Sequence, residues 1–121
     1  MNSRAAKKKL KLHLKKYKAD ENFVITESLV AYWCRVINRA VFQGKVDVHK
    51  IQIRGMRKFW GECDGWTIGI NEQITNRELL ISTIAHEMVH QWQWDNFGKM
   101  NHTDTYLEWK KKFKKEFKID L

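Results

Sequence analysis

The sequence contains no proline, only two cysteines and no long uninterrupted apolar run. Without proline, no rigid Pro-rich linker divides the chain. Cys34 and Cys63 form neither a Cys-x-x-Cys pair nor a disulfide framework, so we interpret both as small buried hydrophobic residues in a reducing compartment. No segment reaches the ~20 apolar residues of a membrane span, and the N-terminus lacks the apolar core of a secretory signal. These absences predict a cytoplasmic protein with no membrane partner.

Acidic residues are missing from residues 1–18, which carry eight Lys or Arg. Residues 19–105 hold nine basic and eleven acidic side chains, and residues 106–118 hold six Lys and two Glu. The net charge of +9 therefore sits at the two ends of the chain. Basic ends suit the phosphate backbone of DNA or RNA, although lysine runs are also common on solvated helix faces. The lysines that we predict as nucleic-acid contacts are Lys7, Lys8, Lys9, Lys11, Lys15, Lys16, Lys111, Lys114, Lys115 and Lys118.

The length of 121 residues and the hydrophobic content of 43% predict a single folded domain, with a monomer as the expected state. Residues 1–24 form a basic N-terminal arm in which leucines alternate with lysines. This arm is expected to be a short helix or to be disordered without a partner. The folded body is expected over residues 25–121.

Hydrophobic spacing predicts an α+β fold. One helix starts at Thr26 and ends near Gln43-Gly44. Three short strands rich in branched residues follow, and Asp64-Gly65 is typical of a hairpin turn between the last two. The candidate strands are Val46–Arg54, Lys58–Cys63 and Trp66–Asn71. We expect a mainly antiparallel three-stranded sheet, with His49 as an exposed residue of its first strand.

A second helix is predicted over residues 76–97. Thr75 and Glu78 match a capping box, and Gly98 can end the helix. This helix carries the sequence His86-Glu87-Met88-Val89-His90. Residues four apart share a helix face, so both histidines can bind one Zn(II) ion, and Glu87 lies beside the open coordination position. About one chain in a hundred of this composition would contain the pattern by chance, so a third ligand is needed to support it.

His102 is the natural third ligand, because twelve residues after His90 leave enough chain to turn and return to the metal. A last helix is expected after Thr103 or Asp104, either of which can cap it. Aromatic residues recur along this helix at intervals of three and four, which favours packing against the core over base stacking. They are Tyr106, Trp109, Phe113 and Phe117. Asp95, Asp104 or backbone carbonyls are candidates to orient the histidines.

Together these residues resemble the SprT-like metallopeptidases, the group that includes the Spartan protease domain. The resemblance covers about residues 25–118. It is carried by Trp33, by the hairpin from Gly61 to Asn71, by the motif from His86 to His90, and by His102 followed by Tyr106. The chain has Thr103 where the family commonly has glycine, and the sequence contains no Cys-rich zinc ribbon after the last helix.

The resemblance implies a zincin-like fold with one Zn(II) per chain, held by His86, His90 and His102, and with Glu87 as general base. It also implies cleavage of proteins bound to DNA. We therefore expect a zinc-dependent endopeptidase that holds an extended substrate along a strand edge of the hairpin ending at Asn71. Tyr106 is assigned either an oxyanion contact or packing. The alternative is a small basic nucleic-acid-binding or interaction protein in which zinc only stabilises the fold.

Overall fold

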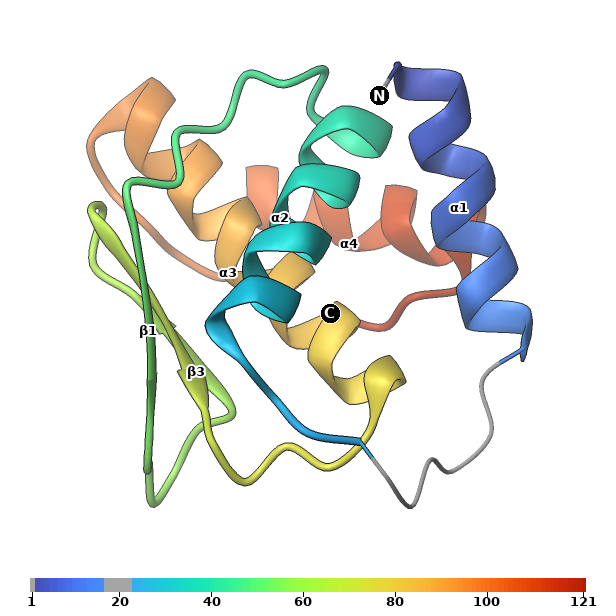
Figure 1. Cartoon of the computed structure of the whole chain (residues 1–121). Helices are drawn as coiled ribbons and strands as arrows, with labels where there is room; N and C mark the ends of the chain where they lie inside the picture. The colour runs from blue at the N-terminus through green and yellow to red at the C-terminus, as the bar shows by residue number, and fades with distance from the viewer. Residues whose placement is uncertain (1, 17–22) are drawn as a thin grey trace.

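The computed structural model describes residues 2–16 and 23–121, with the side chains of residues 2–11 and 23–121. In this part of the chain four helices accompany a three-stranded sheet (Figure 1). The helices are α1 (Ser3–Lys16), α2 (Glu27–Val41), α3 (Arg77–Phe97) and α4 (Thr105–Phe117). The strands are β1 (Lys50–Arg54), β2 (Gly61–Cys63) and β3 (Thr67–Asn71). The predicted α+β class is confirmed. No helix among the described residues is long and apolar enough to cross a membrane.

The sheet has the order β1-β3-β2 and is mixed. The predicted hairpin is confirmed, because β2 and β3 pair antiparallel. At its turn, Oδ1 of Asp64 accepts hydrogen bonds from the backbone N–H groups of Trp66 and Thr67. β1 pairs with β3 in parallel, so the prediction of a mainly antiparallel sheet is wrong. β2 reverses the direction of the chain and β3 reverses it again, which brings β3 back alongside β1 in the same direction.

All three strands begin later than the sequence predicts, at Lys50, Gly61 and Thr67. The amide of Asn71 donates to the carbonyl oxygens of Met56 and Phe59, which holds the chain before β2 in a loop. His49 is exposed as expected, but it precedes β1 and stacks on Trp66 with ring centroids 4.1 Å apart.

The helix boundaries follow local capping. Oγ1 of Thr26 accepts a hydrogen bond from Leu29 N–H at the start of α2, as the sequence predicts. The cap of α3 is Asn76, whose Oδ1 accepts from Leu79 N–H at 2.7 Å. The prediction of Thr75 as the cap is therefore wrong. Asn76 is the residue with extended φ and ψ next to the first turn, and its short side chain reaches the third helical N–H.

The end of α3 and the start of α4 differ in how they are capped. Gly98 ends α3 in the left-handed conformation with φ of 65°, which confirms the predicted stop. Asp104 occupies the N-cap position of α4, but its side chain makes no capping hydrogen bond. A φ of 42° at Asp104 turns the chain sharply into the helix. The loop between the two helices carries His102.

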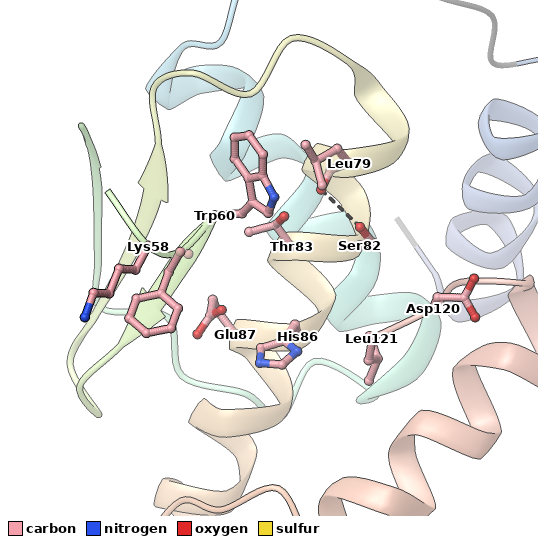
Figure 2. Close-up of a pocket in the computed structure, with 11 residues that line it drawn as sticks. Lys58, Trp60, Leu79, Ser82, Thr83, His86, Glu87, Asp120 and Leu121 are labelled. Carbon is pink, nitrogen blue, oxygen red and sulfur yellow. Dashed lines mark hydrogen bonds between the residues drawn. The ribbon is translucent and has the colours of Figure 1, made fainter. Parts of the chain in front are cut away.

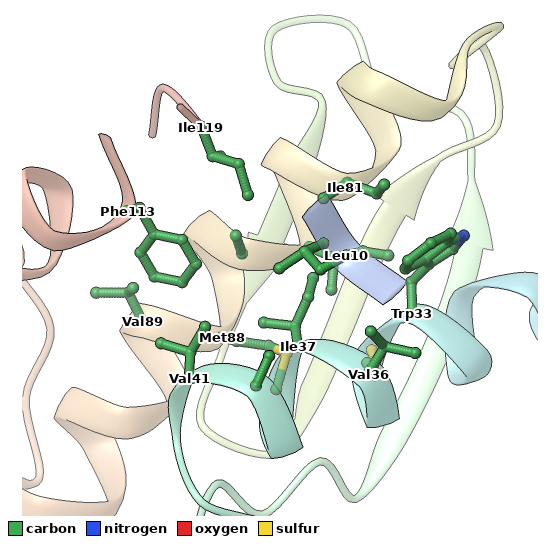
Figure 3. Close-up of a cluster of buried hydrophobic side chains, with 14 of the residues drawn as sticks. Leu10, Trp33, Val36, Ile37, Val41, Ile81, Met88, Val89, Phe113 and Ile119 are labelled. Atoms are coloured by element: carbon green, nitrogen blue, oxygen red, sulfur yellow. The ribbon is translucent and has the colours of Figure 1, made fainter. Parts of the chain in front are cut away.

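The hydrophobic core lies between the four helices and one face of the sheet (Figure 3). α3 runs through its centre, with Ile81, Ile84 and Met88 fully buried. Each side chain of this size contributes about 1.5–3 kcal/mol when removed from water. The aromatic stripe of α4 also packs inward, since Trp109 lies against Phe42 with ring centroids 4.7 Å apart. Because α3 is anchored by this core, the polar residues on its other face have fixed positions.

The N-terminal basic segment is helical and docked. Ala6 and Leu10 of α1 are fully buried in the same core as α2. The Nζ atom of Lys7 lies 3.8 Å from a carboxylate oxygen of Glu116 on α4. The side chains of Lys15 and Lys16, and all of residues 17–22, lie outside the described residues. α1 is therefore part of the packed body and lies beside α4.

Candidate metal centre and active-site cleft

Three histidine side chains meet at the surface of α3. His86 and His90 come from successive turns of this helix, and His102 comes from the loop that follows Gly98. The Nε2 atom of His90 lies 3.1 Å from Nε2 of His86 and 3.1 Å from Nε2 of His102. The remaining pair, His86 and His102, is separated by 3.4 Å. The three residues predicted as ligands therefore present the same ring nitrogen to one point.

This triangle has the size of a zinc site. A tetrahedral zinc ion with Zn–N bonds of about 2.0–2.1 Å places its nitrogen ligands about 3.3 Å apart. The three imidazoles match this edge length, and the described residues offer no fourth His, Cys, Asp or Glu atom to the cluster. Three nitrogen ligands leave one tetrahedral corner for water or substrate. The cluster can thus hold a metal ion in an open site.

Gln93 fixes the orientation of His90. The Nδ1 atom of His90 donates a hydrogen bond to Oε1 of Gln93 at 2.9 Å, which leaves Nε2 free as a ligand. The same Oε1 accepts from Asn101 N–H, and Nε2 of Gln93 donates to Oγ1 of Thr105. Gln93 is 1% exposed, so these bonds are protected from water. One amide therefore orients a ligand and ties down the loop that carries His102.

The sequence analysis missed Gln93 and left Asp95, Asp104 and backbone carbonyls as the candidates. Oδ2 of Asp95 accepts from the backbone N–H of Asp47, and its Oδ1 accepts from the amide of Gln91. The spacing held a usable signal, because a polar residue three positions after a ligand histidine lies on the same helix face. The side chain of Asp104 is exposed and forms no N-cap hydrogen bond. The partner that orients His90 is Gln93, and neither Asp95 nor Asp104 has this role.

Tyr106 packs against the cluster. Its side chain is 5% exposed, and its ring lies parallel to that of His90 with centroids 5.6 Å apart. The hydroxyl oxygen lies 3.3 Å from Nδ1 of His86, where it can accept the ring N–H. Burial, followed by the charge of Glu87, raises the pKa of Tyr106. The contact is one of packing and orientation, and the oxyanion role of Tyr106 stays a prediction.

The two imidazoles on α3 are in the state that binds metal. Burial, with smaller effects from His90, His102 and Lys110, lowers the pKa of His86 to about 4. Burial also lowers the pKa of His90. Both rings are therefore neutral near pH 7, and a neutral imidazole is the form that donates its lone pair to a cation.

Glu87 is buried beside the histidines, next to Gly61 at the start of β2. Its side chain is 6% exposed, and burial, followed by the charge of Glu62, raises its pKa to about 8. The carboxylate fits there because residue 61 is glycine: a Cβ atom at Gly61 would lie 2.9 Å from Oε2 of Glu87 and 2.7 Å from Cγ2 of Thr83. Gly61 is a second residue whose role in the site the sequence did not reveal, since the clash exists only in three dimensions.

A cleft of about 350 Å³ opens directly over Glu87 and His86. Figure 2 shows its floor on α3, with Lys58 and Trp60 on one side and Asp120 and Leu121 on the other. Phe59 and Trp60 at its rim are 62% and 47% exposed, which is unusual for aromatic side chains of this size. The cleft is thus a partly apolar trough that ends at the histidine cluster.

Neither cysteine belongs to the site. Both are free thiols; Cys34 is buried and Cys63 is half-buried. Burial raises the pKa of Cys34 to about 12 and that of Cys63 to about 11. Neutral thiols of this kind are poor metal ligands and poor nucleophiles. Neither thiol is among the residues that cluster with the three histidines.

The predicted nucleic-acid contacts fall on two neighbouring helices. Lys7, Lys8, Lys9 and Lys11 lie on α1, and Lys111, Lys114 and Lys115 lie on α4, with Lys118 at its C-cap. Nζ of Lys11 lies 5.6 Å from the centre of the Phe117 ring, so the two helices approach each other here as well. The two basic ends of the chain are therefore adjacent in space.

Comparison with known proteins places the chain by sequence. No curated protein and no solved structure gives a significant match. The model of the SprT-like family matches residues 30–120. This segment runs from α2 to the residue before the last, and it contains the three clustered histidines and Glu87. The chain belongs to the SprT-like family.

Proposed function

We propose that this protein is a zinc-dependent endopeptidase with a zincin-like fold. Nε2 atoms of His86, His90 and His102 would hold one Zn(II) ion, and Glu87 would be the general base. The observation that supports this proposal most strongly is the position of a buried carboxyl group beside an open face of three nitrogen ligands, at the end of one cleft. A structural zinc site would normally be closed by a fourth protein ligand.

The chemistry divides between the cofactor and the chain. A bound zinc ion acidifies a water molecule and polarises a carbonyl group. The carboxylate of Glu87 takes the proton of the attacking water and then delivers it to the leaving amine nitrogen. In the metal-free protein its pKa of about 8 makes it a stronger base than an exposed glutamate. A bound zinc ion would lower the pKa of Glu87, because a nearby positive charge favours the ionised carboxylate. Gly61 leaves the space that Glu87 needs to reach the reacting atoms.

The free edge of β2 is the proposed docking line for the substrate backbone. We expected this line along a strand edge of the hairpin ending at Asn71. Within that hairpin β3 is the central strand of the sheet, so β2 has the free edge, and β2 lies beside α3. The carbonyl of Trp60 and the N–H of Asp64 bond to β3. Backbone groups alternate in direction along an antiparallel strand, so those of Gly61 and Cys63 point away from β3. An extended peptide pairing there would pass over Glu87 with little dependence on its sequence.

DNA-associated proteins are the proposed substrate class. The support is the meeting of the two basic segments on α1 and α4, which forms one positively charged side of the molecule. A nucleic acid held on that side would raise the local concentration of the proteins bound to it. The activity itself requires only a peptide chain in the cleft.

Substitution of Glu87→Gln tests the catalytic role. The variant keeps the volume of the side chain, so we expect full zinc content and normal DNA affinity together with at least a hundredfold loss of cleavage of a DNA-binding protein. The matched control is Glu78→Gln, an exposed glutamate in the first turn of the same helix, which should cleave at the wild-type rate. Wild-type cleavage by the Glu87 variant would rule out Glu87 as the base.

Metal removal separates the peptidase from the alternative of a zinc-stabilised binding protein. The core that holds α3 contains none of the three histidines, so we expect the metal-free protein to stay folded. Zinc would add only its binding free energy, about 3 kcal/mol at a hundredfold excess over its Kd. Far-UV circular dichroism with and without a chelator measures this. Unfolding on chelation would favour the structural role.

A further inference from the structure

The face of α2 that is turned away from the core carries a groove of about 480 Å³. It is lined by Tyr32, Arg35, Val36, Asn38, Arg39 and Gly44. Arg35 and Arg39 are exposed and lie one helical turn apart, so their guanidinium groups flank the same hollow. The groove thus combines a concave surface with two positive charges.

The charge of this groove is not neutralised. None of the described residues that line it is acidic. Among the described side chains, the ion pairs are Lys7 with Glu116, Arg54 with Glu62, and Lys114 with Asp120, so neither groove arginine takes part in one. Two like charges at this spacing repel each other and destabilise the helix. An external anion would remove that repulsion.

The walls of the groove are held in place before any ligand binds. The amide of Asn38 donates to the carbonyl of Val46 at 3.0 Å and accepts from Val46 N–H at 3.2 Å, which fixes the loop after α2. Gly44 has a φ of 76°, and a Cβ atom there would lie 3.1 Å from Nη1 of Arg39. The guanidinium group of Arg39 therefore rests against the loop backbone, in space that a side chain would fill.

The groove continues into the basic surface of α1. Nζ of Lys9 lies 4.8 Å from the centre of the Tyr32 ring, which is itself a wall of the groove. α1 packs beside both α2 and α4, and residues 2–11 contain no acidic side chain. Lys9 therefore brings positive charge from α1 to the edge of the groove on α2.

We propose that this α2 groove binds the phosphodiester backbone of a nucleic acid, with Arg35 and Arg39 as the phosphate contacts and Lys9 beside them. Guanidinium groups pair with phosphate oxygens through two parallel hydrogen bonds, which lysine cannot do. The buried face of α2 is turned toward the core and α3. The nucleic acid would therefore lie on the side of α2 remote from Glu87, and the catalytic cleft would stay open to protein. The inference gives the proposed DNA association a site, but it does not depend on zinc or on cleavage.

The test compares two double variants by fluorescence anisotropy with a labelled DNA duplex, from 50 to 200 mM salt. One is Arg35→Gln with Arg39→Gln. The other, Arg57→Gln with Lys99→Gln, removes the same charge from exposed positions outside the groove. Glutamine suits a helix, and circular dichroism verifies the fold of each protein.

Loss of two phosphate contacts should reduce the salt slope of the groove variant by about 2. Raising the salt from 50 to 200 mM should therefore reduce the DNA affinity of the groove variant by a factor roughly tenfold smaller than for the wild type. Its affinity at 50 mM salt should fall at least tenfold, while the control pair changes by less than threefold. Equal losses in both double variants would overturn the proposal, because they would reflect net charge alone. The Glu87→Gln assay is independent, so failure of the groove leaves the peptidase proposal intact, and the reverse also holds.

Discussion

The Nδ1 atom of His90 donates a hydrogen bond to Oε1 of Gln93, one helical turn further along α3. The same oxygen accepts the backbone N–H of Asn101, one residue before His102. A single side chain therefore sets the ring orientation of one candidate ligand and the loop position of another.

Replacing Gln93 should weaken metal binding. Gln93→Leu keeps the volume but removes the acceptor, so we expect a 10–100-fold loss of zinc affinity in competition with a chromophoric chelator. Gln93→Glu retains an acceptor for His90 and should bind zinc at least as well as the wild type. Wild-type affinity in the Leu variant would show that the Gln93 contact does not orient the site.

A methyl group at residue 61 should disable Glu87 as the proposed base without weakening zinc binding. In Gly61→Ala the new Cβ atom would lie 2.9 Å from Oε2 of Glu87, so the carboxylate must move. We expect at least a tenfold fall in kcat with unchanged zinc content. The control is Gly69→Ala on β3, where the nearest atom is the flexible Cε of Met56 at 3.1 Å. Equal activity of the two variants would mean that Glu87 tolerates displacement.

The cap of α3 can be measured directly. Asn76→Ala removes the acceptor for Leu79 N–H and should lower the free energy of unfolding by about 1 kcal/mol. Thr75→Ala should change it by less than half as much, because the Thr75 side chain is exposed and does not occupy the N-cap position. Urea denaturation gives both values. A larger loss of stability in Thr75→Ala than in Asn76→Ala would show that Thr75 is the functional cap.

The buried carboxyl group predicts a pH dependence of stability in the metal-free protein. The pKa of Glu87 is raised from an ordinary 4.5 to about 8 in the folded state. As pH rises between these values only the unfolded chain releases its proton, so the wild type loses stability across this window. Glu87→Gln has no proton to lose. Its stability relative to the wild type should therefore increase from pH 4.5 to pH 8, by an amount on the order of 4 kcal/mol.

Urea denaturation in the presence of a chelator checks this prediction at pH 5 and pH 9. The depressed pKa of His86 acts in the opposite direction, since it removes stability as pH falls from 6.5 toward 4. Both proteins share that effect, so their difference isolates Glu87. A constant difference between variant and wild type at the two pH values would contradict the raised pKa.

Most of the correct predictions came from local sequence patterns. The spacing of apolar residues and Gly98 placed α3 within one residue of its observed bounds, and the turn at Asp64-Gly65 placed the hairpin. His102 could be joined to the motif because one loop of suitable length connects it to α3. Each of these inferences depends on residues close together in the sequence.

The errors and omissions depend on contacts between distant segments. The parallel pairing of β1 with β3 follows from how β2 folds back, which no single strand pattern encodes. The fit of Glu87 under Gly61 joins residues 26 positions apart, and the docking of α1 on α4 joins opposite ends of the chain. Asn and Thr are both good N-cap residues, so the sequence could not decide between Asn76 and Thr75. The backbone geometry places Asn76 at the N-cap position.

The free edge of β2 is short, and this sets a limit on how the cleft can hold a peptide. Only Gly61 and Cys63 direct backbone groups outward, so an extended chain gains few hydrogen bonds there, each worth about 1 kcal/mol net. A free peptide would therefore dissociate quickly. If the proposed peptidase activity holds, turnover would depend on how long a substrate stays near this protein, so tethering both to one polymer would select targets by proximity more than by sequence.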